Sequence, residues 1–148
     1  MSKVVSMRIA DEQVERLQRV ARRMGRTTSE TGALLIEEGL RQSEFGHIEF
    51  RDSVVGRQAY LRGTSLAVWE VVSIAKRFDL DTNATANNLE WPLYRVKAAL
   101  HYAAAFPNEI EAALADNDTY SFETLRNILP QAERVTIANE SQRSPDKE

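Results

Sequence analysis

The sequence predicts a mainly α-helical protein in three parts. Residues 1–44 read as a short strand and two helices that complete their fold only as an intertwined dimer. Residues 45–115 read as a small helical domain with a short β-hairpin, and residues 116–148 as a C-terminal arm. Two observations carry this division. A short segment in which alternate residues form two faces precedes two segments with helical spacing of apolar residues. Later segments with the same helical spacing are separated by Gly and Pro.

Composition narrows the function before any motif is considered. The chain has 148 residues, of which 43% are hydrophobic and 28% charged, as in ordinary globular proteins. It contains no Cys, which excludes disulfides, thiolate metal sites and a cysteine nucleophile. Its only histidines, His47 and His101, do not suggest a metal site. No phosphate-binding glycine loop, catalytic triad or paired carboxylate is recognisable, so we expect neither an enzyme nor a bound cofactor or metal.

Charge is distributed unevenly along the chain. Residues 1–29 hold seven basic and three acidic residues, a net charge of +4, whereas residues 116–148 hold four basic and seven acidic residues, a net charge of −3. A basic head favours an anionic partner, and the acidic end favours a different one. There is neither a long apolar run nor a signal-peptide h-region, so we expect a cytoplasmic protein without a membrane partner.

The segment Val4–Ile9 alternates with a period of two, which is typical of a half-buried strand. Val5, Met7 and Ile9 form one face, and Val4, Ser6 and Arg8 form the other. A strand of this length needs a hydrogen-bonded partner, and no similar strand follows nearby. The economical solution is that two chains pair their strands over a shared helical core. The predicted dimer core comprises Val5, Met7, Ile9, Leu17 and Ile36.

Two helices follow the strand. Apolar residues recur at helical spacing as far as Met24, and Gly25 is suited to end that helix. Thr27 is the expected N-cap of the second helix, with Glu30 as its capping-box partner. The pattern of this second helix continues to about Gln42.

The outward row of the paired strands is suited to DNA. A two-stranded ribbon fits the major groove, where Arg8 can donate to guanine, Ser6 can donate or accept, and Val4 can meet a thymine methyl group. The start of the second helix can direct free N–H groups at a phosphate. The predicted DNA-binding residues are Lys3, Val4, Ser6, Arg8, Thr27, Thr28 and Ser29.

Residues 1–42 resemble the ribbon-helix-helix family of the Arc, MetJ and CopG repressors. The strand, the Arg-Met-Gly-Arg-Thr-Thr-Ser turn and both helices carry the resemblance, which implies an operator-binding homodimer. Two positions depart from the family. Ala10 cannot cap the first helix with its side chain, and Gly32 lies inside the second helix at a cost of roughly 0.5–1 kcal/mol. The alternative is a strand and helical hairpin that serve only for dimerisation.

In the middle of the chain, a short strand near Ile48 and Phe50 can pair with residues 58–61, with turns at Gly56 and Gly63. Helical stripes follow, separated by Gly, Asp and Pro signals. We expect four helices: one capped by Thr64 or Ser65 and ending near Phe78, one over residues 82–89 capped by Asp81, one over residues 92–105, and a short one over residues 109–115.

Residues 48–114 resemble the small helical domain of VapB-like antitoxins. The matching segments begin at Phe50-Arg51-Asp52 and continue through residues 56–64, 68–72, 96–104 and 107–110. This resemblance implies a toxin partner of the PIN-type ribonuclease kind. Residues 82–105 also fit a DNA-binding helix-turn-helix, but their few basic residues favour packing or partner binding.

The C-terminal arm is expected to start with an acidic loop over residues 116–120. A helix capped by Ser121 follows, then a lone strand near residues 134–137, and the composition from Asn139 onward is typical of disorder. The arm either packs on its own domain or lies in a groove of a partner. The predicted toxin-binding residues are Phe122, Leu125, Arg126, Ile128, Leu129 and Arg134.

Together these patterns predict an antitoxin of a type II toxin-antitoxin system. Such a protein neutralises a PIN-type ribonuclease and represses its own operon by binding operator DNA as a homodimer, with a higher hetero-oligomer formed with the toxin. The alternative is a free-standing ribbon-helix-helix transcriptional regulator whose helical domain senses a ligand or builds oligomers. A third possibility is a purely structural adaptor.

Overall fold

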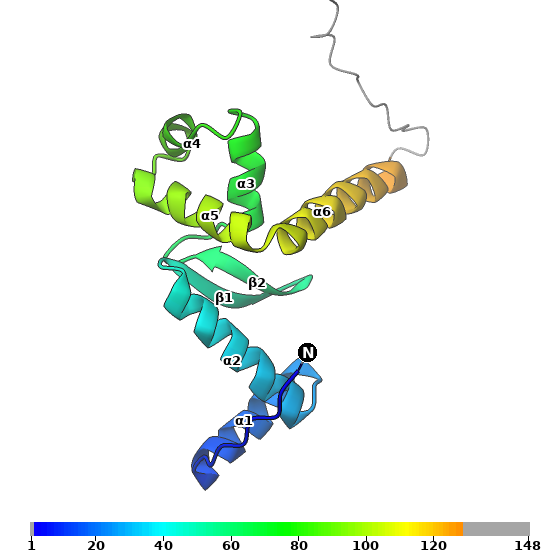
Figure 1. The fold of residues 1–148 in the computed structure, drawn as a ribbon. Coiled ribbons are helices and arrows are strands. Elements are labelled where there is room, and N and C mark those ends of the chain that lie inside the picture. Colours follow the sequence, from blue (N-terminus) through cyan, green and yellow to red (C-terminus); the bar gives the residue numbers. More distant parts are fainter. Residues whose placement is uncertain (1, 129–148) are drawn as a thin grey trace, which may run out of the picture.

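A computed structural model describes residues 2–128 of the chain. The described part is mainly helical, with one two-stranded antiparallel sheet (Figure 1). The elements follow in the order α1 (Asp11–Met24), α2 (Thr28–Glu44), β1 (Ile48–Ser53), β2 (Gly56–Leu61), α3 (Val68–Lys76), α4 (Thr82–Leu89), α5 (Leu93–Ala105) and α6 (Pro107–Ile128). Among these helices none is both long enough and apolar enough to cross a bilayer.

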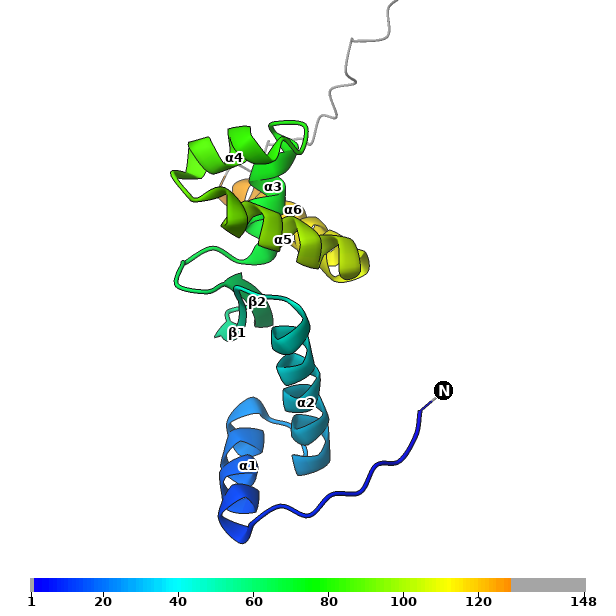
Figure 2. The ribbon, with the colours of Figure 1, turned by 60° about the vertical axis from the view of Figure 1, so that its left-hand side comes forward.

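Helices α1 and α2 pack against each other at one end of the molecule, and the N-terminal segment leads into α1 without joining a sheet (Figure 2). Gly25 ends α1 with a φ of 65°, as predicted. The predicted capping box of α2 is also confirmed. The Glu30 N–H lies 3.1 Å from Thr27 Oγ1, and the Thr27 N–H lies 3.4 Å from Glu30 Oε2. At α1, the Gln13 side chain accepts the Ala10 N–H instead, at 3.1 Å.

The predicted hairpin is confirmed as β1 and β2. Ile48 pairs with Leu61 and Ser53 with Gly56, so the register covers all six residues of each strand. Ile48 and Leu61 are both fully buried and belong to the core that the hairpin shares with the helices that follow it. Gly56 has a φ of 112°, a conformation that side-chain-bearing residues rarely adopt.

Helices α3 and α5 pack against the hairpin, and α4 packs on α3 and α5 (Figure 1). Their core includes Val68, Val71 and Tyr102, which are fully buried. The two tryptophans are partly buried against this core. Asp81 caps α4 as predicted, because its Oδ1 accepts the Ala84 N–H at 3.0 Å.

The predicted cap of α3 is wrong. The helix begins at Val68 with Ala67 as its N-cap, and neither Thr64 nor Ser65 occupies that position. Thr64 Oγ1 instead closes the preceding turn, accepting the Leu66 N–H at 3.2 Å. Its hydroxyl therefore stabilises the turn after β2 rather than the helix.

The predicted break over residues 116–120 is also wrong. A single helix, α6, runs from Pro107 to Ile128 and includes both the expected short helix and the expected start of the arm. The residues in between are polar but include neither Gly nor Pro, so nothing stops the helix from propagating. Ile110 and Leu114 hold the first half of α6 against the core.

Helix α2 is joined to the β-hairpin by an ion pair. Arg57 of β2 donates to Glu38 of α2, with Nε 2.5 Å from Oε1, and also contacts Asp52 at 3.3 Å. The Glu38 side chain keeps only 8% of its surface exposed, and that of Arg57 keeps 25%. The hydrogen bonds to Glu38 raise the pKa of Arg57 above its usual range. The carboxylate is buried, so it requires this partner.

A second polar cluster holds the same helix against α5 and α6. The Arg41 guanidinium donates to Tyr102 Oη at 2.7 Å and to Glu109 Oε1 at 2.9 Å, and lies 3.8 Å from the centre of the Phe106 ring. Tyr102 in turn donates to Glu109 at 2.7 Å. Burial and this contact with Glu109 raise the pKa of Tyr102, so the hydroxyl stays protonated and keeps donating.

Replacing Arg57 tests how strongly α2 is fixed. The variant Arg57→Ala leaves the buried Glu38 carboxylate unpaired, and we expect the free energy of unfolding to fall by roughly 2–3 kcal/mol, measured by urea denaturation. Arg77 is exposed and forms no ion pair within residues 2–128, so Arg77→Ala is the matched control. Equal losses in the two variants would contradict this role for Arg57.

Candidate nucleic-acid interface

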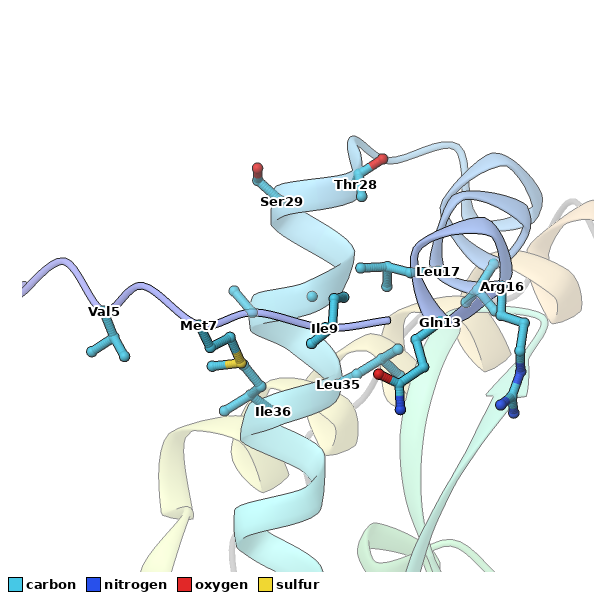
Figure 3. Close-up of a pocket in the computed structure, with 13 residues that line it drawn as sticks. Val5, Met7, Ile9, Gln13, Arg16, Leu17, Thr28, Ser29, Leu35 and Ile36 are labelled. Carbon is cyan, nitrogen blue, oxygen red and sulfur yellow. The ribbon is translucent and has the colours of Figure 1, made fainter. Parts of the chain in front are cut away.

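An apolar groove of about 730 Å³ lies between the N-terminal segment and the facing sides of α1 and α2 (Figure 3). Its apolar walls comprise Val5, Met7, Ile9, Leu17, Val20, Ala33, Leu35 and Ile36. Met7 is 62% exposed and Ile36 50% exposed. Monomeric proteins rarely leave so continuous an apolar surface in water. Within one chain, this surface therefore has no adequate cover.

Residues 2–10 do not form a strand within the single chain, although they alternate as the sequence predicts. A strand requires hydrogen bonds to a neighbour, and no described segment lies beside these residues to supply them. Val5, Met7 and Ile9 line the groove, whereas Val4, Ser6 and Arg8 do not. The structure thus separates the two predicted rows, and both rows are solvent exposed.

Basic side chains are concentrated in the head of the molecule. Lys3 and the six arginines of residues 8–26 are all exposed, and none of them forms an ion pair with another described residue. Arg8 belongs to the outward row of the N-terminal segment, and Arg16 lies at the groove itself. Unpaired exposed arginines retain their full capacity to donate to phosphate oxygens and base edges.

The start of α2 adds backbone donors to the same end of the molecule. Thr27, Thr28 and Ser29 are exposed there, and Thr28 and Ser29 also line the groove. Glu30 and Thr27 satisfy each other, whereas the N–H groups of Thr28 and Ser29 have no acceptor in the described part of the chain. Free N–H groups at a helix start are suited to phosphate.

The structure places all seven predicted DNA-binding residues on the surface of this head, which comprises residues 2–44. It also brings the five predicted dimer-core residues to the one groove. Gly32 lines the groove too, where an added Cβ would make ordinary contact with Leu17 at 3.7 Å. Packing within one chain therefore does not require a glycine at this position.

Sequence reasoning missed two polar residues of the groove, Gln13 and Arg16. Their positions one turn before Leu17 and Val20 place them on the same helix face, and this spacing was the available signal. It also missed the Glu38–Arg57 pair, because the two residues belong to elements that are brought together only by packing.

Of the predicted toxin-binding residues, those within residues 2–128 belong to α6, away from the head (Figure 1). Arg126 is exposed on the second half of α6. Phe122, Leu125 and Ile128 belong to the same helix, and their side chains are outside the described part of the structure. Leu129 and Arg134, together with the strand expected near residues 134–137, also lie outside the described residues.

Comparisons with known proteins return no protein-family model, curated protein or solved structure that matches this chain.

The groove yields a test of dimerisation. Met7→Asp would place a charge inside a shared apolar core, so we expect the variant to be a monomer or to lose the folded head. Ser6→Asp, with the same charge on the opposite face of the segment, should leave the dimer intact. Analytical ultracentrifugation at micromolar concentration distinguishes the two. A monomeric wild-type protein would contradict the proposed pairing.

Proposed function

We propose that this chain binds DNA as a homodimer through a ribbon formed by residues 2–10 of two copies. The observation that carries the proposal is the apolar groove, whose lining includes one row of that segment while the other row carries Arg8 and faces away. A second copy would cover the groove and supply the missing strand. It would also double the outward row on a ribbon of a width that enters the major groove.

The exposed apolar side chains of the head favour pairing of two chains. Val5, Met7, Ile9 and Ile36 are at least 43% exposed in the single chain. Burying a fully exposed side chain of this kind contributes on the order of 1.5–3 kcal/mol, and covering the part that is still exposed contributes the corresponding fraction. Ordering the N-terminal segments and losing translational freedom offset part of that gain. Two copies contribute twice the number of side chains, so the balance favours association.

Within such a complex, the exposed arginines and the start of α2 would have separate roles. Side chains of the outward row would meet base edges and specify sequence. The N–H groups of Thr28 and Ser29 would hold a phosphate, which positions the ribbon without reading sequence. This division is that of a ribbon-helix-helix repressor, the family that residues 1–42 resemble.

We further propose that the protein is the antitoxin of a type II toxin-antitoxin system that represses its own operon. The observation that favours this over a regulator acting alone is α6. Its first half packs through Ile110 and Leu114, but from Ala115 onward every side chain described in the helix is exposed. With 22 residues it is about 33 Å long and extends away from the helical domain (Figure 1).

An exposed helix of this kind is suited to lie in the groove of a partner. The proposed partner is a PIN-type ribonuclease, as the resemblance of residues 48–114 to VapB-like antitoxins implies. The alternative, a free-standing regulator whose helical domain binds a ligand or builds oligomers, would leave the second half of α6 without a function.

Replacing Arg8 tests the DNA-binding proposal. A binding site is first selected from random duplexes with the wild-type protein. On that site we expect Arg8→Ala to lose roughly 1–3 kcal/mol of binding free energy and to relax the base preference, measured by titration and repeated selection. Arg77→Ala, far from the head, is the control. Unchanged affinity and preference in Arg8→Ala would show that the ribbon does not read DNA.

Truncation tests the division of labour between the head and α6. A chain that lacks residues 117–148 should bind DNA normally but should no longer rescue cells from the nuclease encoded beside it. Phe122→Ala with Leu125→Ala should have the same effect, since the apolar residues of a docking helix carry much of its binding energy. Full rescue by the truncated chain would assign neutralisation to the middle domain alone.

A further inference from the structure

A second pocket, of about 370 Å³, lies where the end of α2 meets α5. Its lining includes Phe45, His47, Tyr94, Lys97 and His101. The only two histidines of the chain, distant in the sequence, thus line one pocket. This pocket is separate from the groove of the head, with which it shares no residue.

The walls of the pocket are aromatic. The His47 and Tyr94 rings are 4.7 Å apart, and the Phe45 and His101 rings are 5.2 Å apart, measured between centroids. Phe45 also packs edge-on against Tyr102, at 5.6 Å, which ties this wall to the buried core. Rings held in this way offer faces and edges on which another planar ring can stack.

The backbone fixes the position of His47. Its φ is 66°, which places it in the left-handed region, and its carbonyl oxygen accepts the Arg62 N–H at 2.7 Å. This bond continues the hairpin by one residue beyond the register of β1 and β2. The His47 ring is therefore presented by a constrained turn rather than by a free loop.

Helix α5 supplies the other polar groups. Tyr94, Lys97 and His101 lie on one helix face at helical spacing. Arg95 turns away from them and lies over the Trp91 ring, 5.7 Å from its centre. Within residues 2–128, neither Lys97 nor either histidine is in an ion pair or a side-chain hydrogen bond. Among the residues that line the pocket there is no carboxylate.

We propose that this pocket binds a small planar aromatic anion, in which a ring carries a carboxylate or a phosphate. The ring would stack between the aromatic walls, and the anionic group would accept from the Lys97 ammonium and from the imidazoles. The volume is near the lower limit of small-molecule pockets, which suits a ligand of one or two rings. The proposal goes beyond DNA binding and toxin neutralisation and depends on neither.

The two histidines also provide the readout, because their ring protons give separate NMR signals that His47→Gln and His101→Gln assign. The full-length protein is titrated near neutral pH with salicylate and with adenosine monophosphate. Saturable shifts of both signals with either probe support the proposal, and the probe that binds identifies the anionic group as carboxylate or phosphate. Phenol and inorganic phosphate carry only one of the two features, so we expect each to bind about tenfold more weakly or worse.

Matched lysine variants make the test specific. Lys97→Gln should weaken binding about tenfold, because one charge-assisted hydrogen bond is lost. Lys76→Gln removes the same charge from the exposed end of α3 and should leave binding unchanged. Tyr94→Ala is a second variant at an exposed site, and loss of its ring should also weaken binding. Shifts that rise linearly with probe concentration, or equal affinities in Lys97→Gln and the wild-type protein, would overturn the proposal.

Discussion

Helix α2 belongs to two units at once, and the buried ion pair between Glu38 and Arg57 holds them together. A carboxylate that is withdrawn from water must keep its partner, so this contact tolerates little displacement between α2 and the hairpin. Arg41 adds contacts to Tyr102 and Glu109 at the end of the same helix. The helical domain is thus connected to the head by a continuous helix, and a second chain placed against the head would orient both helical domains.

The two units differ in how completely they bury their apolar surface. The helical domain closes a core around fully buried residues such as Ile48, Val71 and Tyr102. The head instead leaves Met7 and Ile36 in an open groove. A two-helix unit is too thin to cover its own apolar face, so the proposed dimer would complete the fold of the head. The proposed DNA contact has the same origin, because the outward row reaches a duplex as a ribbon only after two segments pair.

Several predictions that rest on contacts between near neighbours in the sequence are confirmed by the structure. Gly25 ends α1, and Thr27 with Glu30 begins α2, because each of these interactions spans only a few residues. The predicted cap of α3 and the predicted break over residues 116–120 are wrong. In both places the polar residues are compatible with more than one local structure. Thr64 can cap a helix or close a turn, and in the structure its hydroxyl closes the turn after β2. The polar residues after Ala115 fit a loop or a helix, and the anchored start of α6 extends through them.

By itself the sequence determined where most helices begin and end, the pairing of the hairpin, and which face of residues 4–9 is apolar. These properties follow from caps, breakers and periodicity, which act between near neighbours. Only the tertiary structure decided which distant side chains meet. It brought Glu38 to Arg57, and His47 to the pocket that also contains His101. Such meetings depend on how apolar faces pack together, and no local pattern encodes the packing between elements that are far apart in the chain.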